Sequence, residues 1–232
     1  MDEDEIRKSA VLEQRHWWYA GRRAMVRREL AGLPAGRALD VGCGMGGNSA
    51  VLRDLGWQVA ALDFSPAATE AAQARGLAVL RGDAQHLPFP DGTFDLVMST
   101  DAWEHIEDDA LVATEAHRVL RPGGHLLVAV PAGMDLWSGH DVALGHHRRY
   151  ERAQLVSLVE DAGFRVDDVF GWNVLLRPVA RLRRRNRDDS QSEMEAVNPL
   201  VNAGLRTVVA VEAVLPVRRR RGISLVLRAT RR

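Results

Sequence analysis

Short apolar runs alternate along the chain with longer segments that mix apolar and polar positions. The apolar runs predict strands at 37–42, 58–63, 77–82, 94–100, 125–130, 164–171 and 223–230. The segments between them predict helices near 20–32, 46–55, 66–75, 107–119, 151–162 and 199–214. Strands that alternate with helices favour a parallel sheet covered by helices on both faces, so we expect an α/β fold.

Two segments fall outside this alternation. The first carries the aromatic run Trp17-Trp18-Tyr19, which cannot all lie on one face of a helix, so it either packs on the core or forms a lid over the substrate. The second is longer than a turn between strands needs and contains the polar stretch Asp188–Ser192 and an apolar helix. We expect one domain with four parts: a helical arm over 1–32, a core over 33–172, an insertion over 173–221 and a last strand over 222–232.

A glycine-rich turn follows the first predicted strand. Asp40 ends that strand, and Gly42, Gly44 and Gly47 then satisfy the spacing G-x-G-x-x-G. Glycines let the backbone approach a ligand closely, and the start of the next helix offers free N–H groups. The pattern indicates a nucleotide-type cofactor, and its spacing alone also permits an NAD(P)-dependent oxidoreductase.

Further motifs follow the glycine turn in a fixed order. Asp63 ends the second strand, Arg81–Ala84 follows the third, and Leu87–Val97 and Arg118–Gly124 precede the next two. Together the five motifs resemble the class I S-adenosylmethionine-dependent methyltransferases over roughly 33–170. The resemblance implies a Rossmann-like seven-stranded, mostly parallel sheet with helices on both faces and an antiparallel last strand. It also implies S-adenosylmethionine as the methyl donor.

The resemblance assigns a role to each matching position of the donor site. The positions are Asp40, Gly42 and Gly44 along the methionine and ribose, Asp63 on the ribose hydroxyls, Phe64 against the adenine, Asp83 and Ala84 at the adenine edge, and Ser99 and Thr100 beside the sulfonium.

The acceptor side is expected at the carboxyl ends of the fourth and fifth strands, where open α/β sheets bind ligands. A histidine near neutral pKa suits removal of a proton from an oxygen or nitrogen acceptor. The candidates are His140 first, then His105 and His146, with Asp141 orienting one of them. Predicted substrate contacts are Trp17, Trp18, Tyr19, Trp103, Arg148 and Tyr150, although Tyr150 also suits an anchor between this loop and the next helix.

The loop after the fifth strand has a further resemblance. Its His-Asp and Gly-His-x-Arg-Arg-Tyr patterns, together with the Trp-Trp arm, are similar to those of a subset of bacterial methyltransferases. Many members of that subset act in small-molecule or glycolipid biosynthesis, which implies a small-molecule or a lipid- or sugar-linked acceptor. A non-catalytic partner subunit that binds the cofactor remains an alternative.

A metal site in the same loop is a competing interpretation. His140, Asp141, His146 and His147 could supply two imidazoles and a carboxylate. Their spacing matches no established metal motif, so we expect no metal ion.

Charge is balanced overall, with 31 basic and 31 acidic residues, but it is uneven along the chain. From Arg165 onward there are fifteen arginines against seven acidic residues, with clusters at Arg183–Arg185 and Arg218–Arg221. These clusters predict either a solvated surface or contact with an anionic membrane or a phosphorylated substrate. The domain as a whole is not basic, so nucleic acid is not expected. The insertion could also form a homodimer surface.

The remaining composition fits a cytoplasmic enzyme. The acidic start shows no secretory signal, and no run of about 18 apolar residues predicts a membrane span. Cys43 is the single cysteine, which excludes an intrachain disulfide.

Overall fold

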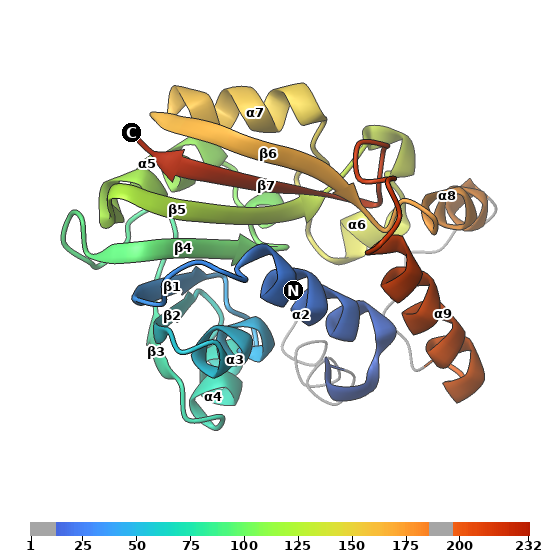
Figure 1. The fold of residues 1–232 in the computed structure, drawn as a ribbon, viewed down its shortest axis with the longest axis horizontal. Coiled ribbons are helices and arrows are strands. Elements are labelled where there is room, and N and C mark those ends of the chain that lie inside the picture. Colours follow the sequence, from blue (N-terminus) through green and yellow to red (C-terminus); the bar gives the residue numbers. More distant parts are fainter. Residues whose placement is uncertain (1–12, 186–196) are drawn as a thin grey trace.

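A computed structural model describes residues 13–185 and 197–232 of the chain (Figure 1). The predicted polar loop Asp188–Ser192 and the first twelve residues of the arm lie outside this part. Seven strands form one sheet in the order β3-β2-β1-β4-β5-β7-β6. Their bounds are β1 Arg37–Val41, β2 Gln58–Asp63, β3 Ala78–Arg81, β4 Phe94–Thr100, β5 Leu120–Pro131, β6 Phe164–Trp172 and β7 Ser224–Arg231.

The pairing of the strands confirms the predicted topology. The pairs β1–β2, β2–β3, β1–β4 and β4–β5 are all parallel. β7 lies between β5 and β6 and runs antiparallel to both. The order reverses at β1, which pairs with β2 on one side and with β4 on the other, and ligands of such sheets bind at the carboxyl ends beside this switch.

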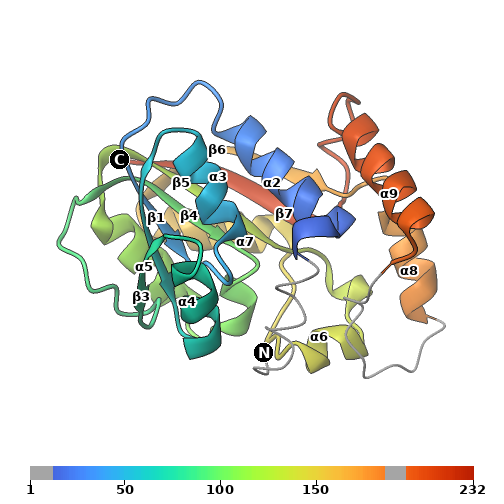
Figure 2. The ribbon, with the colours of Figure 1, turned by 90° about the horizontal axis from the view of Figure 1, so that it is seen from below.

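Helices cover both faces of the sheet (Figures 1 and 2). One layer contains α2 (Trp17–Glu29), α3 (Gly47–Asp54) and α4 (Pro66–Gln73), with α9 (Pro199–Glu212) packed against α2. The opposite layer contains α5 (Asp109–Val119) and α7 (Arg152–Asp161). Each layer closes its own core, one around Leu52 and Met98 and the other around Val97 and Phe164, so both faces of the sheet are apolar.

The arm packs on the core through its aromatic residues. α2 begins at Trp17, three residues earlier than predicted, because the His16 side chain accepts a hydrogen bond from the backbone N–H of Trp18 and caps the helix. The Trp18 ring lies edge-on against Trp172, with 4.8 Å between centroids. The arm also reaches the glycine turn, where a Cβ added to Gly47 would lie 2.1 Å from Oε1 of Glu13.

Several short elements were not predicted from the sequence. They are α6 (Gly139–Ala143), α8 (Arg177–Arg185) and two single 3₁₀ turns, Trp103–His105 and Met134–Leu136. α6 is too short for a helical period to be visible, and its start is instead fixed by a capping box between Ser138 and Asp141. α8 was not predicted, because it consists largely of arginines and has few apolar residues from which a helical period could be recognised. Among the helices of the described ranges, none combines the length and the apolar character that crossing a bilayer requires.

Candidate active site

The glycine turn is tight on one side and open on the other. Gly42, Gly44 and Gly46 have positive φ angles of 72°, 53° and 81°, which side chains disfavour. A Cβ on Gly42 would lie 2.4 Å from the Cβ of Ala102, whereas a Cβ on Gly44 would meet no atom within 4 Å. The open side of Gly44 therefore leaves room for a ligand against the backbone.

Asp63 holds the turn against the end of β2. Its two carboxylate oxygens accept hydrogen bonds from the backbone N–H groups of Gly44, at 2.8 Å, and Ser65, at 2.9 Å. The next side chain, Phe64, is 72% exposed. An exposed aromatic ring beside an anchored carboxylate suits a ligand that has both a flat ring and hydroxyl groups.

Asp40 is a buried carboxylate whose hydrogen bonding is incomplete. It is 1% exposed, and its Oδ2 accepts a 2.5 Å hydrogen bond from the Ser49 hydroxyl. Its Oδ1 has no hydrogen-bond partner among the described residues. Burial raises the pKa of Asp40 to about 7 against the Ser49 hydrogen bond, and the carboxylates of Asp63 and Glu13 add to the increase. A cationic group on a ligand would satisfy the open oxygen.

The remaining predicted donor residues have different surroundings. Ser99 is buried and donates its hydroxyl to the carbonyl of Val41 at 2.8 Å, so it joins β4 to β1. Thr100 accepts a 2.9 Å hydrogen bond from Asn48, a residue that the sequence did not single out although it follows the glycine turn directly. Asp83 accepts from the backbone N–H of Gln85 at 2.9 Å, and Ala84 is buried.

These observations fit S-adenosylmethionine. The open oxygen of Asp40 suits the ammonium of its methionine part, the space over Gly44 admits the chain of the cofactor, and Phe64 is free to meet the adenine. The residues come from the adjacent strands β1 and β2, whose carboxyl ends lie at the same edge of the sheet.

Asp141 lies at the centre of the segment between β5 and α7, which carries most of the predicted acceptor residues and is called the acceptor loop below. It is 0% exposed, and its Oδ1 lies 2.7 Å from Nε of Arg149 and 2.9 Å from Nδ1 of His146. Its Oδ2 accepts from the backbone N–H of Ser138 at 3.0 Å and lies 3.6 Å from Nη1 of Arg184 on α8. Burial alone would raise the pKa of Asp141, but the hydrogen bond with His146 and the charges of Arg149 and Arg184 lower it to about 2.

His146 connects this centre to the residues after β4. Its ring lies edge-on to that of His105, with 4.7 Å between centroids. Its Nε2 lies 4.0 Å from Oε1 of Glu104, which is 1% exposed. Burial lowers the pKa of His105 to about 4, and the neighbouring His146 acts in the same direction. The structure therefore brings together two of the three predicted histidines, His105 and His146, with Asp141 oriented toward His146.

Other predicted substrate contacts help to build the loop. Tyr150 is buried and donates its hydroxyl to Oδ2 of Asp109 at 2.7 Å, so it anchors the loop to the start of α5, whereas the sequence suggested an anchor to the next helix. Arg148 lies 2.7 Å from the same oxygen and donates to the carbonyl of Glu107. Trp103 is buried in the core on the α5 side of the sheet. His140 lies half-buried on α6, one residue before Asp141.

The arm meets the acceptor edge through Arg22. The Arg22 guanidinium lies 4.2 Å from the ring centroid of Trp172 and 5.3 Å from that of Trp18. One of its nitrogens donates to Oδ1 of Asp101 at 2.8 Å, directly after β4. Trp17 and Tyr19 are half-buried on α2. The lid function of the arm stays a prediction.

Four charged residues that shape the site had no predicted role in it, namely Arg22, Glu104, Arg149 and Arg184. Glu104 had a signal, because it is an acid between an aromatic residue and a histidine directly after a strand. Arg184 belongs to a basic cluster that predicted either a solvated surface or contact with an anionic membrane or substrate, yet its side chain turns inward to Asp141 and to the carbonyl of Leu136.

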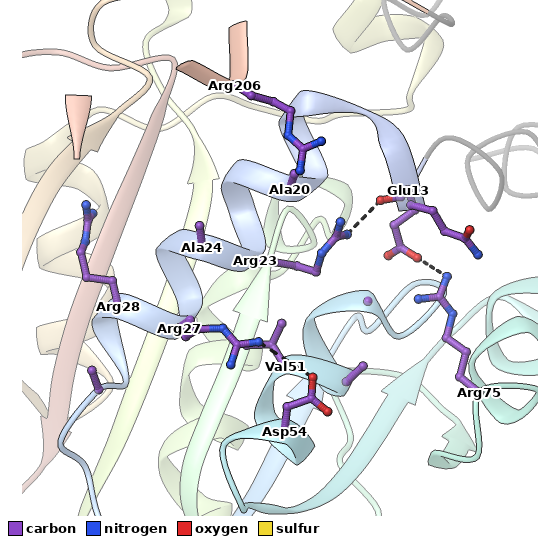
Figure 3. Close-up of a pocket in the computed structure, with 14 residues that line it drawn as sticks. Glu13, Ala20, Arg23, Ala24, Arg27, Arg28, Val51, Asp54, Arg75 and Arg206 are labelled. Carbon is purple, nitrogen blue, oxygen red and sulfur yellow. Dashed lines mark hydrogen bonds and ion pairs between the residues drawn. The ribbon is translucent and has the colours of Figure 1, made fainter. Parts of the chain in front are cut away.

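A broad hollow of about 810 Å³ lies between α2 and α3, and none of its lining residues belongs to the acceptor loop (Figure 3). Arg23 and Arg27 point into it from α2, and Asp54 faces Arg27 from α3. At its other end the carboxylate of Glu13 pairs with Arg75. The hollow runs along the helix layer and reaches Gly47 at one end, but none of the residues predicted to contact the acceptor lines it, so we do not assign the acceptor to it.

Comparisons with known proteins agree with this geometry. The family model described as a methyltransferase domain matches residues 39–128. The protein named "Probable S-adenosylmethionine-dependent methyltransferase" of Mycolicibacterium smegmatis is 35% identical over 69% of this chain and 64% of its own length. The 2-methyl-6-phytyl-1,4-hydroquinone methyltransferase of Synechocystis is 44% identical over 41% of this chain and 32% of its own length. The chain thus spans less than two thirds of either relative.

Solved structures share the fold as well. The crystal structure of a SAM-dependent methyltransferase from Thermotoga maritima covers 99% of this chain and 96% of its own, with a TM-score of 0.67 at 20% identity. At that identity the likeness shows the fold alone.

Proposed function

Because the chain belongs to the class I S-adenosylmethionine-dependent methyltransferases, we propose that it transfers a methyl group from S-adenosylmethionine to an oxygen or nitrogen atom of a small molecule. The proposal rests on the residues that come together at one edge of the sheet. There the incompletely bonded Asp40 and the open glycine turn end β1, while Glu104 and His105 follow the neighbouring strand β4.

The donor residues have distinct tasks in this proposal. Asp40 accepts a hydrogen bond from the ammonium of the methionine part, and Asp63 accepts from the ribose hydroxyls while its backbone bonds keep it in place. Phe64 lies against the adenine. The cofactor, when bound, supplies an activated methyl group on a sulfonium, so the protein has to align the acceptor and exclude water.

The acceptor loses its proton at the cluster of Glu104, His105 and His146. Proton removal by a well-placed side chain contributes roughly 10²–10⁴-fold in rate. Among the histidines, His105 and His146 suit the task better than His140, because Asp141 fixes the ring of His146 and that ring contacts His105.

The insertion supports a lipid-linked acceptor. Val179 and Leu182 on α8 and Leu200 and Val214 near α9 are exposed apolar side chains. The neighbouring basic clusters are partly used inside the protein, since Arg218 pairs with Glu29 and Arg184 with Asp141. The exposed arginines that remain, with these apolar side chains, suit an anionic membrane surface that delivers the acceptor.

A radiolabelled methyl-transfer screen tests the proposal. It offers a prenylated hydroquinone, a set of amines and phosphorylated small molecules, with and without vesicles that contain anionic lipid. We expect labelled product with at least one hydroxyl or amine acceptor, and its loss in Asp63→Ala. The matched control is Asp91→Ala, an exposed aspartate far from the glycine turn in sequence, which should keep the activity.

The alternatives predict other results in the same experiments. Saturable binding of S-adenosylhomocysteine with no transfer to any acceptor would favour a non-catalytic partner subunit. Saturable binding of NAD(P) would favour an oxidoreductase. Size-exclusion chromatography at several concentrations tests whether the exposed α8 and α9 side chains instead form a homodimer.

A further inference from the structure

We propose that Glu104, His105 and His146 form a binding site for a divalent transition-metal ion with the preferences of Zn²⁺ or Fe²⁺. One ligand atom from each residue, a carboxylate oxygen and two imidazole nitrogens, lies within 4.8 Å of the other two. Two histidines and one carboxylate are a frequent ligand set for both ions. The set shares only His146 with the four residues weighed from the sequence.

The spacing of the three ligand atoms fits a small metal ion. Nε2 of His146 and Oε1 of Glu104 are 4.0 Å apart. Nitrogen and oxygen ligands lie about 2.0–2.2 Å from zinc, which places ligand atoms of a tetrahedral site about 3.4 Å from one another. Side-chain rotations that bring the atoms together by roughly 1 Å therefore complete the site.

Asp141 orients the His146 ring so that its other nitrogen could bind a metal ion. Metal-bound histidines usually donate their second ring N–H to a carboxylate or carbonyl, which fixes the ring and its tautomer. Nδ1 of His146 lies 2.9 Å from Oδ1 of Asp141, so Nε2 is left facing Glu104. Arg149 and Arg184 balance the charge of Asp141, so Glu104 is the carboxyl group that is left to serve as the oxygen ligand.

The side chain of Glu104 gives a second, independent observation that points to a ligand at this place. Its Oε2 is buried and has no hydrogen-bond partner among the described residues. Buried polar atoms are almost always paired with protein, water or an ion. The backbone N–H of His147 donates to the carbonyl of Glu104 at 2.7 Å, which ties the two ligand-bearing segments together without using the side chain.

Resting on the proposed function, the metal would face the acceptor. Three protein ligands leave a fourth position open, and a metal in such a site binds a hydroxyl oxygen and lowers its pKa. The acceptor hydroxyl would then release its proton to water, and His105 and His146 would act as metal ligands in place of the proton-accepting role proposed above. The sulfonium carbon–sulfur bond breaks as the new carbon–oxygen bond forms, which leaves a neutral thioether. The inference thus favours an oxygen acceptor.

Titration with Co²⁺ tests the site directly, with neither methyl donor nor acceptor present. We expect one Co²⁺ per chain with visible absorption bands, displaced by Zn²⁺ and not by Mg²⁺, which prefers oxygen ligands. His105→Ala and Glu104→Gln should each weaken Co²⁺ binding more than about 100-fold, and Asp141→Asn about 10–100-fold. His147→Ala changes the exposed neighbour and should bind as the unaltered protein does.

Two results would overturn the site: no Co²⁺ binding by the unaltered chain, or equal binding by Glu104→Gln and the unaltered chain. Glu104→Gln keeps the size of the side chain, so it decides the question even if His105→Ala fails to fold. Metal binding is measured apart from turnover, so loss of the site and failure of methyl transfer are separate outcomes.

Discussion

Asp40 and Asp141 are both buried aspartates, yet their surroundings shift their pKa values in opposite directions. Within residues 13–185 and 197–232, Asp40 has one hydroxyl partner and one oxygen without a partner, and its pKa is raised to about 7. Asp141 contacts His146, Arg149 and Arg184, and its pKa is lowered to about 2. Asp40 could therefore bind a cationic group of a ligand, whereas Asp141 is already paired with cationic side chains of the protein.

The difference separates the two halves of the site. In the proposed donor pocket, Asp40 has one carboxylate oxygen without a partner among the described residues; this costs stability in the ligand-free protein, and a bound cationic group would recover it. The acceptor loop is internally balanced, so Asp141 orients His146 and does not itself react. Substitutions of the two aspartates should therefore have opposite effects on stability.

The largest effect is expected for Asp141→Ala. Removing this carboxylate leaves the buried guanidinium of Arg149 without its partner, and breaking a buried pair in this way costs about 3–5 kcal/mol. Urea denaturation measures the loss. The control Asp91→Ala breaks a pair with Arg118 in which the aspartate is largely exposed, and should cost no more than about 1 kcal/mol. Equal losses in the two variants would show that Asp141 has no central structural role.

Asp40→Asn should instead raise the free energy of unfolding of the ligand-free protein, by on the order of 2–4 kcal/mol at pH 8. The pKa of Asp40 is raised from 3.8 to about 7 in the folded state, so the folded protein holds an extra proton between these values. The unaltered protein therefore loses stability relative to the variant as the pH rises from about 4 to about 7. Denaturation at pH 4 and pH 8 should show the gain at pH 8 only. An equal difference at both pH values would contradict the raised pKa.

Asp63→Ala is expected to weaken binding of S-adenosylhomocysteine by about 10–100-fold, since hydrogen bonds to a charged group contribute about 1.5–3 kcal/mol. The variant removes both the predicted ribose contact and the bond that holds Gly44. Calorimetric titration measures the change. Asp63→Asn, which can still accept from Gly44, separates the two causes: recovery of most of the affinity would assign the effect to the turn.

Tyr150→Phe should have the smallest effect, a loss of about 1 kcal/mol in the free energy of unfolding from one hydrogen bond to Asp109. Because Tyr150 anchors the loop, the affinity for S-adenosylhomocysteine should not change. A large fall in methyl transfer with unchanged stability would instead restore Tyr150 as a substrate contact.

The placement of the predicted donor residues was largely predictable because its signals are local. Asp40, Gly42 and Gly44 lie within five residues, and Asp63 ends the next strand, so the motif and the strand pattern place them together. The acceptor half depends on contacts between distant segments. Glu104 and His146 meet only because β4 and β5 are neighbours, and Arg184 reaches Asp141 from a helix that no periodicity revealed.

The donor pocket can be tested most directly by calorimetric titration with S-adenosylhomocysteine and with NAD⁺, on the unaltered protein and on Asp40→Asn. We predict one S-adenosylhomocysteine per chain, no saturable NAD⁺ binding, and weaker S-adenosylhomocysteine binding in the variant despite its greater stability. Saturable NAD⁺ binding, or full S-adenosylhomocysteine affinity in Asp40→Asn, would contradict the role assigned to the open carboxylate.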